Sequence, residues 1–280
     1  MNNLSTVAVK GKRKISFVQS ILSPMSRKLK ANVKIEFQKG SYLIKTADHK
    51  DEISQAYQLR YEIFYNEYCG RTNALGIDHD RFDKNADILV IIDLKTGKVI
   101  GTYRAICSEF SKRFYSASEF NIGNFLAEDG VKVELSRACI HKDYRNGAAI
   151  RLLWRGIHQY LNAVEARYLF GCSSISGVRP LAILALMNYL HRHELTLNHW
   201  EIFPHQTFDR SSQLLKDLRD FGLHNPIADI PALFRAYLNA GAKFEVVPAY
   251  DEQFLCYDFF TVLDVQKINA NHARRFGSRE

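Results

Sequence analysis

The chain has 280 residues, of which 46% are hydrophobic and 12% are aromatic, so its composition allows a sizeable core and excludes global disorder. Its net charge of +8 is unevenly placed. Residues 1–35 contain eight Lys or Arg and no Asp or Glu, whereas the other 30 basic residues are balanced by 30 acidic ones. The sequence therefore predicts a neutral body with a basic arm, and we expect three regions: the arm 1–35, a main domain 36–268 and a tail 269–280.

The basic arm has the pattern of a helix that lies on a membrane surface. Its apolar residues recur at helical spacing beside basic ones, with Val18, Ile21, Leu22, Met25 and Leu29 on the apolar side. Pro24 would kink this helix. We expect the arm to bind an anionic membrane surface, and the alternative is a solvated terminus.

Other features of the chain exclude several classes of protein. No apolar run reaches the roughly 18 residues of a membrane-spanning helix, and the N-terminus lacks the apolar stretch and cleavage site of a signal peptide. The five cysteines are scattered without a Cys-x-x-Cys pair, which indicates reduced thiols in a cytoplasmic protein and no zinc site. No base-reading element accompanies the arm, so we expect no nucleic-acid partner. The expected location is cytoplasmic, peripheral on the inner membrane face if the arm binds lipid.

The first half of the chain predicts one long helix among strands. A strand is expected over 42–47, a helix over 51–68, and a polar loop with short helical pieces over 70–87. Two strands, 88–93 and 99–106, flank Lys95-Thr96-Gly97, which is a hairpin signal. A loop or short helix over 114–126 leads to a strand over 131–140.

The second half predicts more helix. A helix follows Gly147, and its apolar face is formed by Ile150, Leu153, Trp154, Ile157 and Leu161. A buried strand over 168–175 precedes an apolar helix over 181–190. A helix over 230–240, ended by Gly241, and strands over 242–247 and 254–263 complete the chain. This order predicts one α/β (α+β) domain with a mixed sheet.

The strand over 131–140 and the turn after it carry the strongest functional signal. The strand contains Glu134-Leu135-Ser136-Arg137, and the turn at Gly147 precedes a helix. Such a turn directs backbone N–H groups and the positive end of a helix dipole toward a phosphate. A thioester donor on a phosphopantetheine arm needs both parts, an anion site beside a polar reaction centre.

Spaced motifs over roughly residues 40–268 resemble one family. Tyr144-x-x-Gly147-x-Ala149 approximates the acyl-CoA loop of the GNAT superfamily, with Tyr where Gln or Arg is usual. Further segments match in order: Leu59-Arg60-Tyr61-x-x-Phe64, Asp78-x-Asp80-x-Phe82-Asp83 with Asp87, Gly101-Thr102-Tyr103-Arg104, Glu134-Leu135-Ser136-Arg137 and Pro248-Ala249-Tyr250-Asp251. Together they resemble the GNAT family of ornithine–acyl carrier protein N-acyltransferases, for which the label "hemolysin" is also used.

The resemblance implies a fold and a reaction. The fold would be a mixed, mostly antiparallel GNAT sheet flanked by helices. The reaction would move a long-chain, usually 3-hydroxylated, acyl group from acyl carrier protein to the α-amine of an amino acid and form a lyso-aminolipid. Ornithine is the first expected acceptor, with glycine or lysine next, and acyl-CoA is the alternative donor. No metal or redox cofactor is expected.

Two alternatives remain open. The chain is also similar to acyl-homoserine lactone synthases, which share the acidic loop and the Glu-Leu-Ser-Arg strand. Those usually have a Trp soon after the Phe of the first helix, where this chain has Tyr68-Cys69-Gly70, so the lipid-forming branch is favoured. A non-enzymatic membrane-binding protein is the other alternative, and a lytic one would need an insertable segment that this sequence lacks.

The matched motifs contain the expected catalytic and acceptor-binding residues. Glu134 is the expected base for the substrate ammonium, and the alternative is an ion pair with Arg137 or Arg104. These two arginines either bind the substrate carboxylate or fix the acids. The acidic loop, with Arg60, either holds a cationic acceptor or only shapes the loop through ion pairs and helix caps; its acids are Asp78, Asp80 and Asp83.

The turn before the helix contains the expected donor-binding residues, which are Tyr144, Arg145, Asn146, Gly147, Ala148 and Ala149. A basic patch formed by Lys142, Arg145, Arg151 and Arg155 would dock the acidic carrier protein. Ser136 and Cys139 are poor nucleophile candidates, because direct attack by the amine needs no acyl-enzyme. The stretch 114–125 either lines an acyl tunnel or packs in the core. His224-x4-Asp229 has the spacing of glycerolipid acyltransferases, and we interpret it as coincidental.

Overall fold

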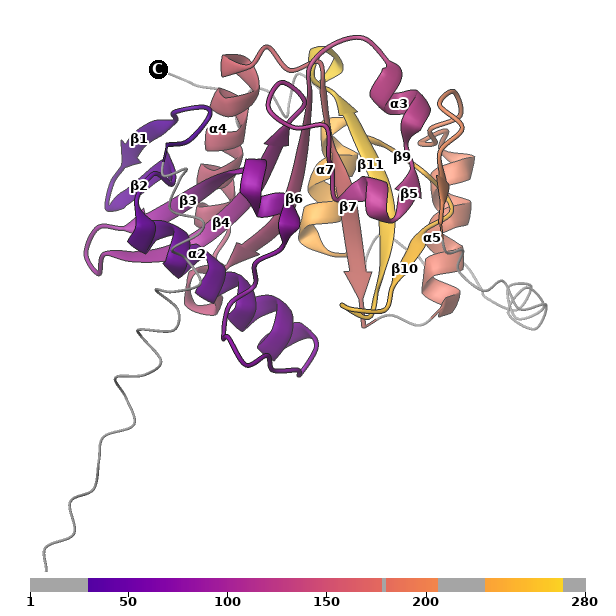
Figure 1. Ribbon diagram of the computed structural model, residues 1–280. Coiled ribbons are helices and arrows are strands. Elements are labelled where there is room, and N and C mark those ends of the chain that lie inside the picture. The colour runs from indigo at the N-terminus through magenta and orange to yellow at the C-terminus, as the bar shows by residue number, and fades with distance from the viewer. Residues whose placement is uncertain (1–29, 178–179, 206–229, 269–280) are drawn as a thin grey trace, which may run out of the picture.

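The computed structural model describes residues 30–177, 180–205 and 230–268, and its centre is a mixed sheet of nine strands (Figure 1). The order is β1-β2-β3-β4-β6-β7-β11-β10, with β9 also paired to β11. Their bounds are β1 Glu36–Lys39, β2 Tyr42–Thr46, β3 Asp87–Asp93, β4 Lys98–Cys107, β6 Lys132–Ile140, β7 Tyr168–Ser176, β9 Lys243–Phe244, β10 Ala249–Asp251 and β11 Cys256–Asp264. Only the β6–β7 pair is parallel. The expected mixed, mostly antiparallel sheet is confirmed.

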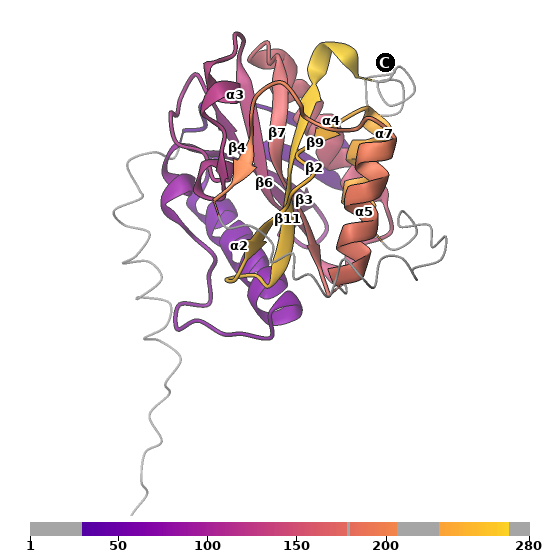
Figure 2. The same cartoon turned by 90° about the vertical axis from the view of Figure 1, so that its right-hand side faces the viewer.

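Helices cover both faces of this sheet. They are α2 Lys50–Tyr61, α3 Gly123–Ala127, α4 Ala148–Ala163, α5 Pro180–Arg192 and α7 Ala232–Ala240. On β3, Leu89 packs in one cluster with α4, α5 and α7, whereas its neighbour Ile88 packs in another cluster with α2. Successive strand residues point to opposite faces, so α2 lies on one face of the sheet and α4, α5 and α7 lie on the other. Figure 2 shows α2 and α5 on opposite sides of the sheet.

The predicted apolar stripe of α4 is buried. Leu153, Trp154 and Ile157 are at most 4% exposed and pack over the sheet. Gly156 lies between them, and a β-carbon there would be 2.9 Å from a methyl carbon of Leu89 and 3.0 Å from one of Ile44, so a larger residue would displace these side chains. The helix can therefore approach the strands more closely than a larger residue would allow.

Several element boundaries differ from the sequence-based prediction. The helix predicted over 51–68 ends as an α-helix at Tyr61 and continues as a π-helix over Glu62–Tyr68. The strand predicted over 242–247 is only the two-residue β9. The stretch 114–126 contains a 3-10 turn, the two-residue strand β5 (Phe120–Asn121) and α3, and β5 pairs with β8 (Phe203–Pro204). The prediction missed β1, whose residues are mostly exposed and lack apolar alternation.

The basic arm enters the fold at its C-terminal end. The backbone N–H groups of Asn32 and Val33 donate to the carboxylate of Asp87, and Tyr160 donates to the same group. Val33 and Ile35 belong to the main core. Most of the arm (1–29), the His224–Asp229 motif and the tail 269–280 lie outside the described residues.

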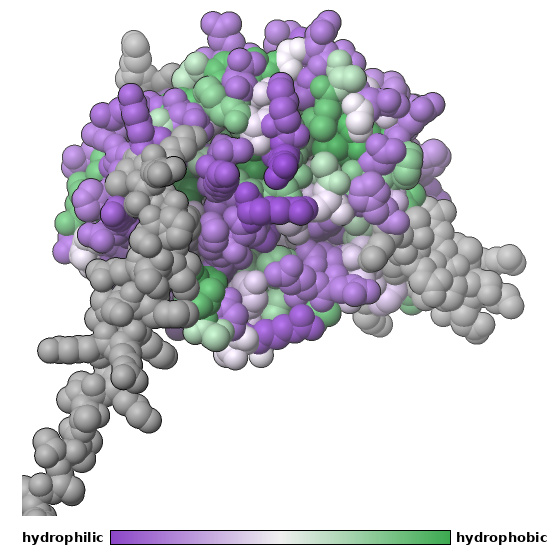
Figure 3. All heavy atoms as spheres, in the orientation of Figure 1, coloured by the Kyte–Doolittle hydropathy of each residue, from purple (hydrophilic) through white to green (hydrophobic). Residues whose placement is uncertain are grey.

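The described surface is largely hydrophilic on the face seen in Figure 3. Hydrophobic side chains lie there in small patches. Among the residues that the structure describes, no helix is both long enough and apolar enough to cross a membrane.

The two parallel strands separate after the first third of their length. Each has nine residues, yet only Lys132–Glu134 pair with Tyr168–Phe170. At the next position Gly171 faces the carbonyl oxygen of Leu135, and a β-carbon would lie 2.3 Å from that oxygen. Further along β6, Arg137 has a left-handed backbone with φ 53°. Beyond this contact, residues 136–140 of β6 and 172–176 of β7 do not pair with each other, so the sheet is open between the two strands.

Candidate active site

One face of the open sheet carries buried polar groups on four neighbouring strands. Arg104 on β4 lies opposite Ser136 on β6, and Glu134 is paired across the parallel ladder with Phe170. Cys172 follows on the same face of β7, and Asp258 lies on β11, two residues before the partner of Cys172. Arg104, Glu134 and Asp258 are at most 2% exposed. Buried charges are costly, so each must have a partner or a ligand.

Arginines and aspartates from the acidic loop and the sheet form one cluster. Arg60 binds both oxygens of Asp83 at 2.7 and 3.1 Å, and its Nε donates to Asp78 at 2.9 Å. Burial disfavours charge, but Arg60 and Arg104 outweigh it and lower the pKa of the Asp83 carboxyl. These ion pairs hold the acidic loop in shape, which is one of the two roles that the sequence predicts for its acids. Asp80 and Asp83 also form a capping box at the 3-10 helix Arg81–Asn85.

The other part of the cluster is formed by Asp80 with Arg104 and Arg137. Arg104 Nη1 donates to Asp80 at 2.6 Å, and Arg137 Nη2 donates to the other oxygen of Asp80 at 3.2 Å. The side chain of Asp80 is 24% exposed, whereas those of the other members are at most 9% exposed. Arg104 Nη2 is buried and has no hydrogen-bond partner among the described residues. Arg137 Nε also has no hydrogen bond there, although it lies 3.0 Å from Asp78. The cluster thus offers one accessible carboxylate and, in Arg104 Nη2, a buried donor with neither a hydrogen bond nor an ion-pair contact among those residues.

Glu134 is held by a loop rather than by the arginines. Its two carboxylate oxygens accept the backbone N–H groups of Tyr115 and Ser116 at 2.7 and 2.6 Å. Burial raises the pKa of this carboxyl, and the hydrogen bonds only partly offset it. The alternative considered for Glu134, an ion pair with Arg137 or Arg104, is not formed. The Ser116 side chain also hydrogen-bonds to this carboxylate. A raised pKa suits a general base.

Tyr115 connects Glu134 with a second group of acidic residues near β10 and β11. Its hydroxyl donates to Asp251 at 3.0 Å, and its ring lies 5.0 Å from the Arg137 guanidinium. On its far side, Glu119 and Asp258 bring carboxyl oxygens within 4.8 Å of the Cys172 sulfur and of each other. Burial, followed by the charge of Asp258, raises the pKa of Glu119 to about 10. The pair therefore shares a proton at neutral pH.

Sequence reasoning missed the Glu119–Asp258 pair. The two residues are 139 positions apart, no motif contains both, and only the pairing of β7 with β11 brings Asp258 to the loop. The isolated acid inside the apolar strand β11 was the available signal, because buried strands rarely contain an unpaired Asp.

Two groups of described residues have metal-ligand geometry, and both use Asp258. They are Glu119, Cys172 and Asp258, and Asp251, Cys256 and Asp258. Burial raises the pKa of both thiols, which favours the protonated form over the thiolate that metals prefer. The donor set therefore fits a proton-sharing cluster better than a metal centre.

The raised pKa of Glu119 predicts a pH dependence of stability. The unfolded chain releases this proton near the ordinary Glu pKa of about 4.3, whereas the folded chain keeps it, so stability should fall as pH rises from about 5 to about 9. Glu119→Gln removes the group that titrates. Its melting temperature relative to wild type should rise with pH over this window. A constant difference, measured by calorimetry, would contradict the shared proton.

The expected donor turn lies at the end of β6. Arg145 Nε donates to the carbonyl oxygen of Ile140 at 2.9 Å, and Gly147 begins α4 with a left-handed φ of 81°. Asn146 caps the backbone N–H of Ala148 at 3.0 Å. The turn therefore places the N-terminus of α4, with Ala149 in its first turn, beside the region where β6 and β7 separate.

Two predicted donor residues have protein partners in this structure. Arg145 forms a bidentate ion pair with Glu67 on the π-helix, and Tyr144 donates to Asp93 at 2.9 Å. Gly147, the residue that begins α4, has no side chain to cap the helix, and the Asn146 side chain caps the Ala148 N–H instead. Arg151 is exposed and Lys142 is exposed, so both are accessible to a partner.

The remaining sequence-based expectations have clear outcomes. Ser136 accepts from Arg104 Nε at 2.8 Å, and burial raises the pKa of Cys139 to about 12, so neither is an activated nucleophile. Phe114 and Phe125 are buried in an aromatic core with Trp200, which supports core packing rather than a tunnel for this stretch. All five cysteines are free thiols, as predicted.

Comparison with known proteins shows the family of this chain. Residues 59–155 match the acetyltransferase (GNAT) domain family. The chain is 30% identical over 253 residues to L-ornithine N(alpha)-acyltransferase of Rhodobacter capsulatus (85% of this chain, 95% of that protein). It is 27% identical over 257 residues to the enzyme of the same name from Brucella abortus (85% and 90%).

Among solved structures, a CoA-dependent acyl-homoserine lactone synthase, BjaI, superposes with a TM-score of 0.45 and 14% identity (83% of this chain, 85% of that chain). The extent of the sequence similarity decides the family. The motifs of the Arg–Asp cluster and of the turn at Gly147 lie within the matched domain. The chain belongs to the family of L-ornithine N(alpha)-acyltransferases and is an acyltransferase of GNAT fold.

Proposed function

We propose that this enzyme transfers a long-chain 3-hydroxyacyl group from acyl carrier protein to the α-amine of ornithine and forms a lyso-ornithine lipid. Ornithine is proposed as the acceptor because the chain is 30% identical to a relative named for ornithine Nα-acylation, over 95% of the relative's length. The site is consistent with a dicationic acceptor, because acidic groups lie on both sides of the separated strands and Asp80 is accessible.

The acceptor would be held by opposite charges. An ammonium group of ornithine would lie against Asp80, and Arg104 Nη2, which is buried without a partner in the described part of the chain, would bind the acceptor carboxylate. Asp78, Asp83 and Arg60 would hold the loop, since their side chains are almost fully buried and mutually paired.

The reaction would be a direct aminolysis. Glu134 accepts a proton from the α-ammonium, directly or through water, and the free amine attacks the thioester carbonyl. The C–N bond forms, the C–S bond breaks, and the pantetheine sulfur leaves as a thiol. The N-terminus of α4 at Gly147 would bind the pantetheine phosphate. Lys142 and Arg151 would meet the acidic carrier protein, which implies salt-sensitive docking.

One assay tests this function. Purified protein is mixed with 3-hydroxyacyl carrier protein and ornithine, glycine or lysine, and the products are read by mass spectrometry. We expect Nα-acylornithine as the main product and little reaction from the same acyl-CoA. Absence of acylornithine with both donors would refute the acceptor, and equal rates from both donors would refute carrier-protein dependence.

Asp80→Asn should weaken acceptor binding selectively. The substitution removes the accessible charge but keeps the shape, so KM for ornithine should rise by about tenfold while KM for the donor changes little. Steady-state kinetics with each substrate varied in turn measure this. An equal rise for both substrates, with a lowered melting temperature, would assign Asp80 to loop structure only.

The basic arm is proposed to hold the enzyme on anionic membrane. Deleting residues 1–29 removes six basic residues and leaves the Asp87 anchor of Asn32 and Val33 in place. Because each basic residue near such a surface contributes about 1 kcal/mol, the truncated protein should no longer sediment with phosphatidylserine vesicles at low salt, while the assay in solution stays active. Equal sedimentation of both proteins would contradict the proposal.

A further inference from the structure

Tyr115 lies between Glu134 and an acidic residue of β10, and it contacts both of them. Its backbone N–H donates to Glu134 Oε2 at 2.7 Å, and its hydroxyl donates to Asp251 Oδ2 at 3.0 Å. Tyr115 and Asp251 are 136 positions apart in the chain. One residue therefore links the proposed base on β6 to β10, the last strand of the sheet.

Asp251 is itself fixed at the other end of this contact. Its second oxygen, Oδ1, accepts the backbone N–H groups of Gln253 and Phe254 at 2.7 and 3.0 Å. Because both carboxylate oxygens have donors, the side chain is held in one orientation. The Tyr115 hydroxyl is thus bound to a group that the turn between β10 and β11 keeps in place.

The ring of Tyr115 has contacts of its own. It packs edge-on against Phe82, with the ring centres 5.7 Å apart, and the Arg137 guanidinium lies 5.0 Å from its centre. A phenylalanine at this position can keep both ring contacts. Removing the hydroxyl alone therefore breaks the bond to Asp251 and leaves the ring in place.

The loop of Tyr115 also influences the charge of Glu134. Burial raises the pKa of this carboxyl, and the strongest opposing effects are hydrogen bonds from the Ser116 side chain and from the N–H groups of Ser116 and Tyr115. The charge of Arg104 on β4 lowers the pKa as well. If the loop moves away, the hydrogen bonds lengthen, and the pKa of Glu134 must rise further.

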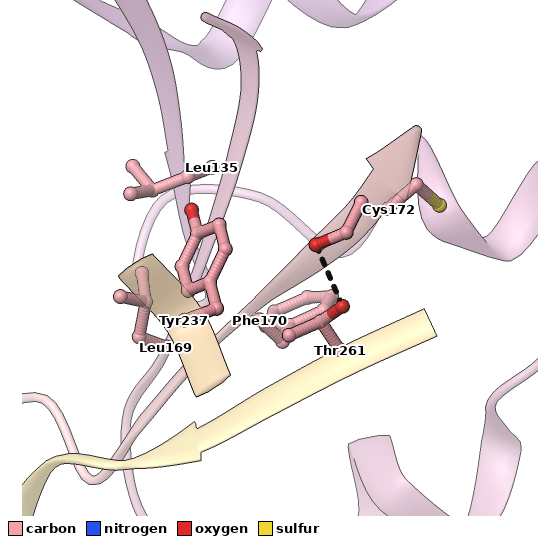
Figure 4. Close-up of a pocket in the computed structure, with 8 residues that line it drawn as sticks. Leu135, Leu169, Phe170, Cys172, Tyr237 and Thr261 are labelled. Carbon is pink, nitrogen blue, oxygen red and sulfur yellow. Dashed lines mark hydrogen bonds between the residues drawn. The ribbon is translucent and has the colours of Figure 1, made fainter. Parts of the chain in front are cut away.

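On the β7 side, the loop of Tyr115 meets Cys172, whose Sγ lies 3.5 Å from Ser116 Oγ. Figure 4 shows the Cys172 side chain directed away from Tyr237, which lies on the other face of β7. The next titratable groups are Glu119 and Asp258, with oxygens within 4.8 Å of this sulfur. These groups remain when only the tyrosine hydroxyl is removed, so they contribute to the pH profiles of both proteins.

We propose that Tyr115 is a positioning residue for catalysis, because its hydroxyl bond to Asp251 holds the loop whose N–H groups fix the Glu134 carboxylate. The inference rests on the proposed function, in which Glu134 accepts a proton from the acceptor ammonium. Without the bond, the carboxylate is less well oriented and is protonated at a higher pH. The loss should therefore appear in kcat rather than in the KM for ornithine.

Tyr115→Phe is the first test. Its kcat should fall by about tenfold near neutral pH, with little change in the KM for ornithine, and the acidic limb of its kcat profile should move to higher pH. Tyr250→Phe is the matched control. This half-buried tyrosine lies next to Asp251 on β10 and packs against Tyr257, so its variant should keep the rate and the profile.

A double-mutant cycle with Asp251 tests whether the effect passes through the same bond. Asp251→Ala should lower kcat at least as much as Tyr115→Phe, and the double variant should be no slower than Asp251→Ala alone. Asp251→Asn keeps an oxygen for the turn and an amide beside the hydroxyl, so it should retain most of the rate.

Three outcomes would overturn the inference: a kcat near that of wild type in Tyr115→Phe, a lower rate without movement of the acidic limb, or independent losses that multiply in the double variant. Tyr115→Phe decides the matter even if Asp251→Ala folds poorly. Failure of the proposed function is distinct, because wild type would then form no acylornithine.

Discussion

Replacing Glu134 by glutamine is expected to lower turnover by about 100-fold or more, as for loss of a general base. The structure adds a second reason. The glutamate accepts two backbone N–H groups, from Tyr115 and Ser116, whereas the amide offers only one oxygen and would turn its NH₂ group toward the second donor. The loop that carries Tyr115 should therefore shift as the base is lost. The kcat of the purified variant measures the effect, with the exposed Glu109→Gln as the control.

The pH profile separates the two contributions of Glu134. If the carboxylate is the base, the variant should lose the acidic limb of the kcat/KM profile and retain most of its melting temperature. If the carboxylate only positions the loop, the profile should keep its shape at a lower rate. Near wild-type activity in the folded variant would exclude both roles.

Asp83→Asn should be among the most destabilising single changes in the chain. The carboxylate and its bidentate partner Arg60 are both 0% exposed, and the variant leaves the arginine charge buried without a full counter-charge. Breaking such a pair costs about 3–5 kcal/mol in the free energy of unfolding. Denaturant titration measures the loss. Asp48→Asn, in the half-exposed pair with Lys45, is the control and should cost less than about 1 kcal/mol.

The same ion pair predicts that the folded protein loses stability at low pH. The partners of Asp83 lower its folded pKa below that of the unfolded chain, so its stabilisation is present above about pH 4 and is lost as the pH falls through the folded value. Wild type should therefore lose more stability between pH 5 and 3, as rough limits, than Asp83→Asn does. A parallel loss in both proteins would mean that other carboxylates dominate.

The motifs predicted which polar residues meet, although not always how. Arg60, Arg104 and Arg137 come from three separate segments, and the structure joins them with the three aspartates of the acidic loop. For Glu134 the sequence offered a base or an ion pair with an arginine, and the carboxylate binds loop N–H groups rather than an arginine. The sequence could not show this, because the loop conformation that turns those N–H groups toward β6 depends on packing of Phe114 and Phe120 in the core.

By itself, the sequence determined the element types with strong periodicity, the hairpin at Lys95–Gly97 and the start of α4 at Gly147. These depend on local backbone preference and on burial of one face of an element, which neighbouring residues already encode. Only the tertiary structure decided the separation of β6 from β7, the carboxyl pair of Glu119 and Asp258, and the hydrogen bond of Tyr115 to Asp251. Each of these joins residues from different strands or loops, and the register of the sheet, which no local pattern contains, is what brings them into contact.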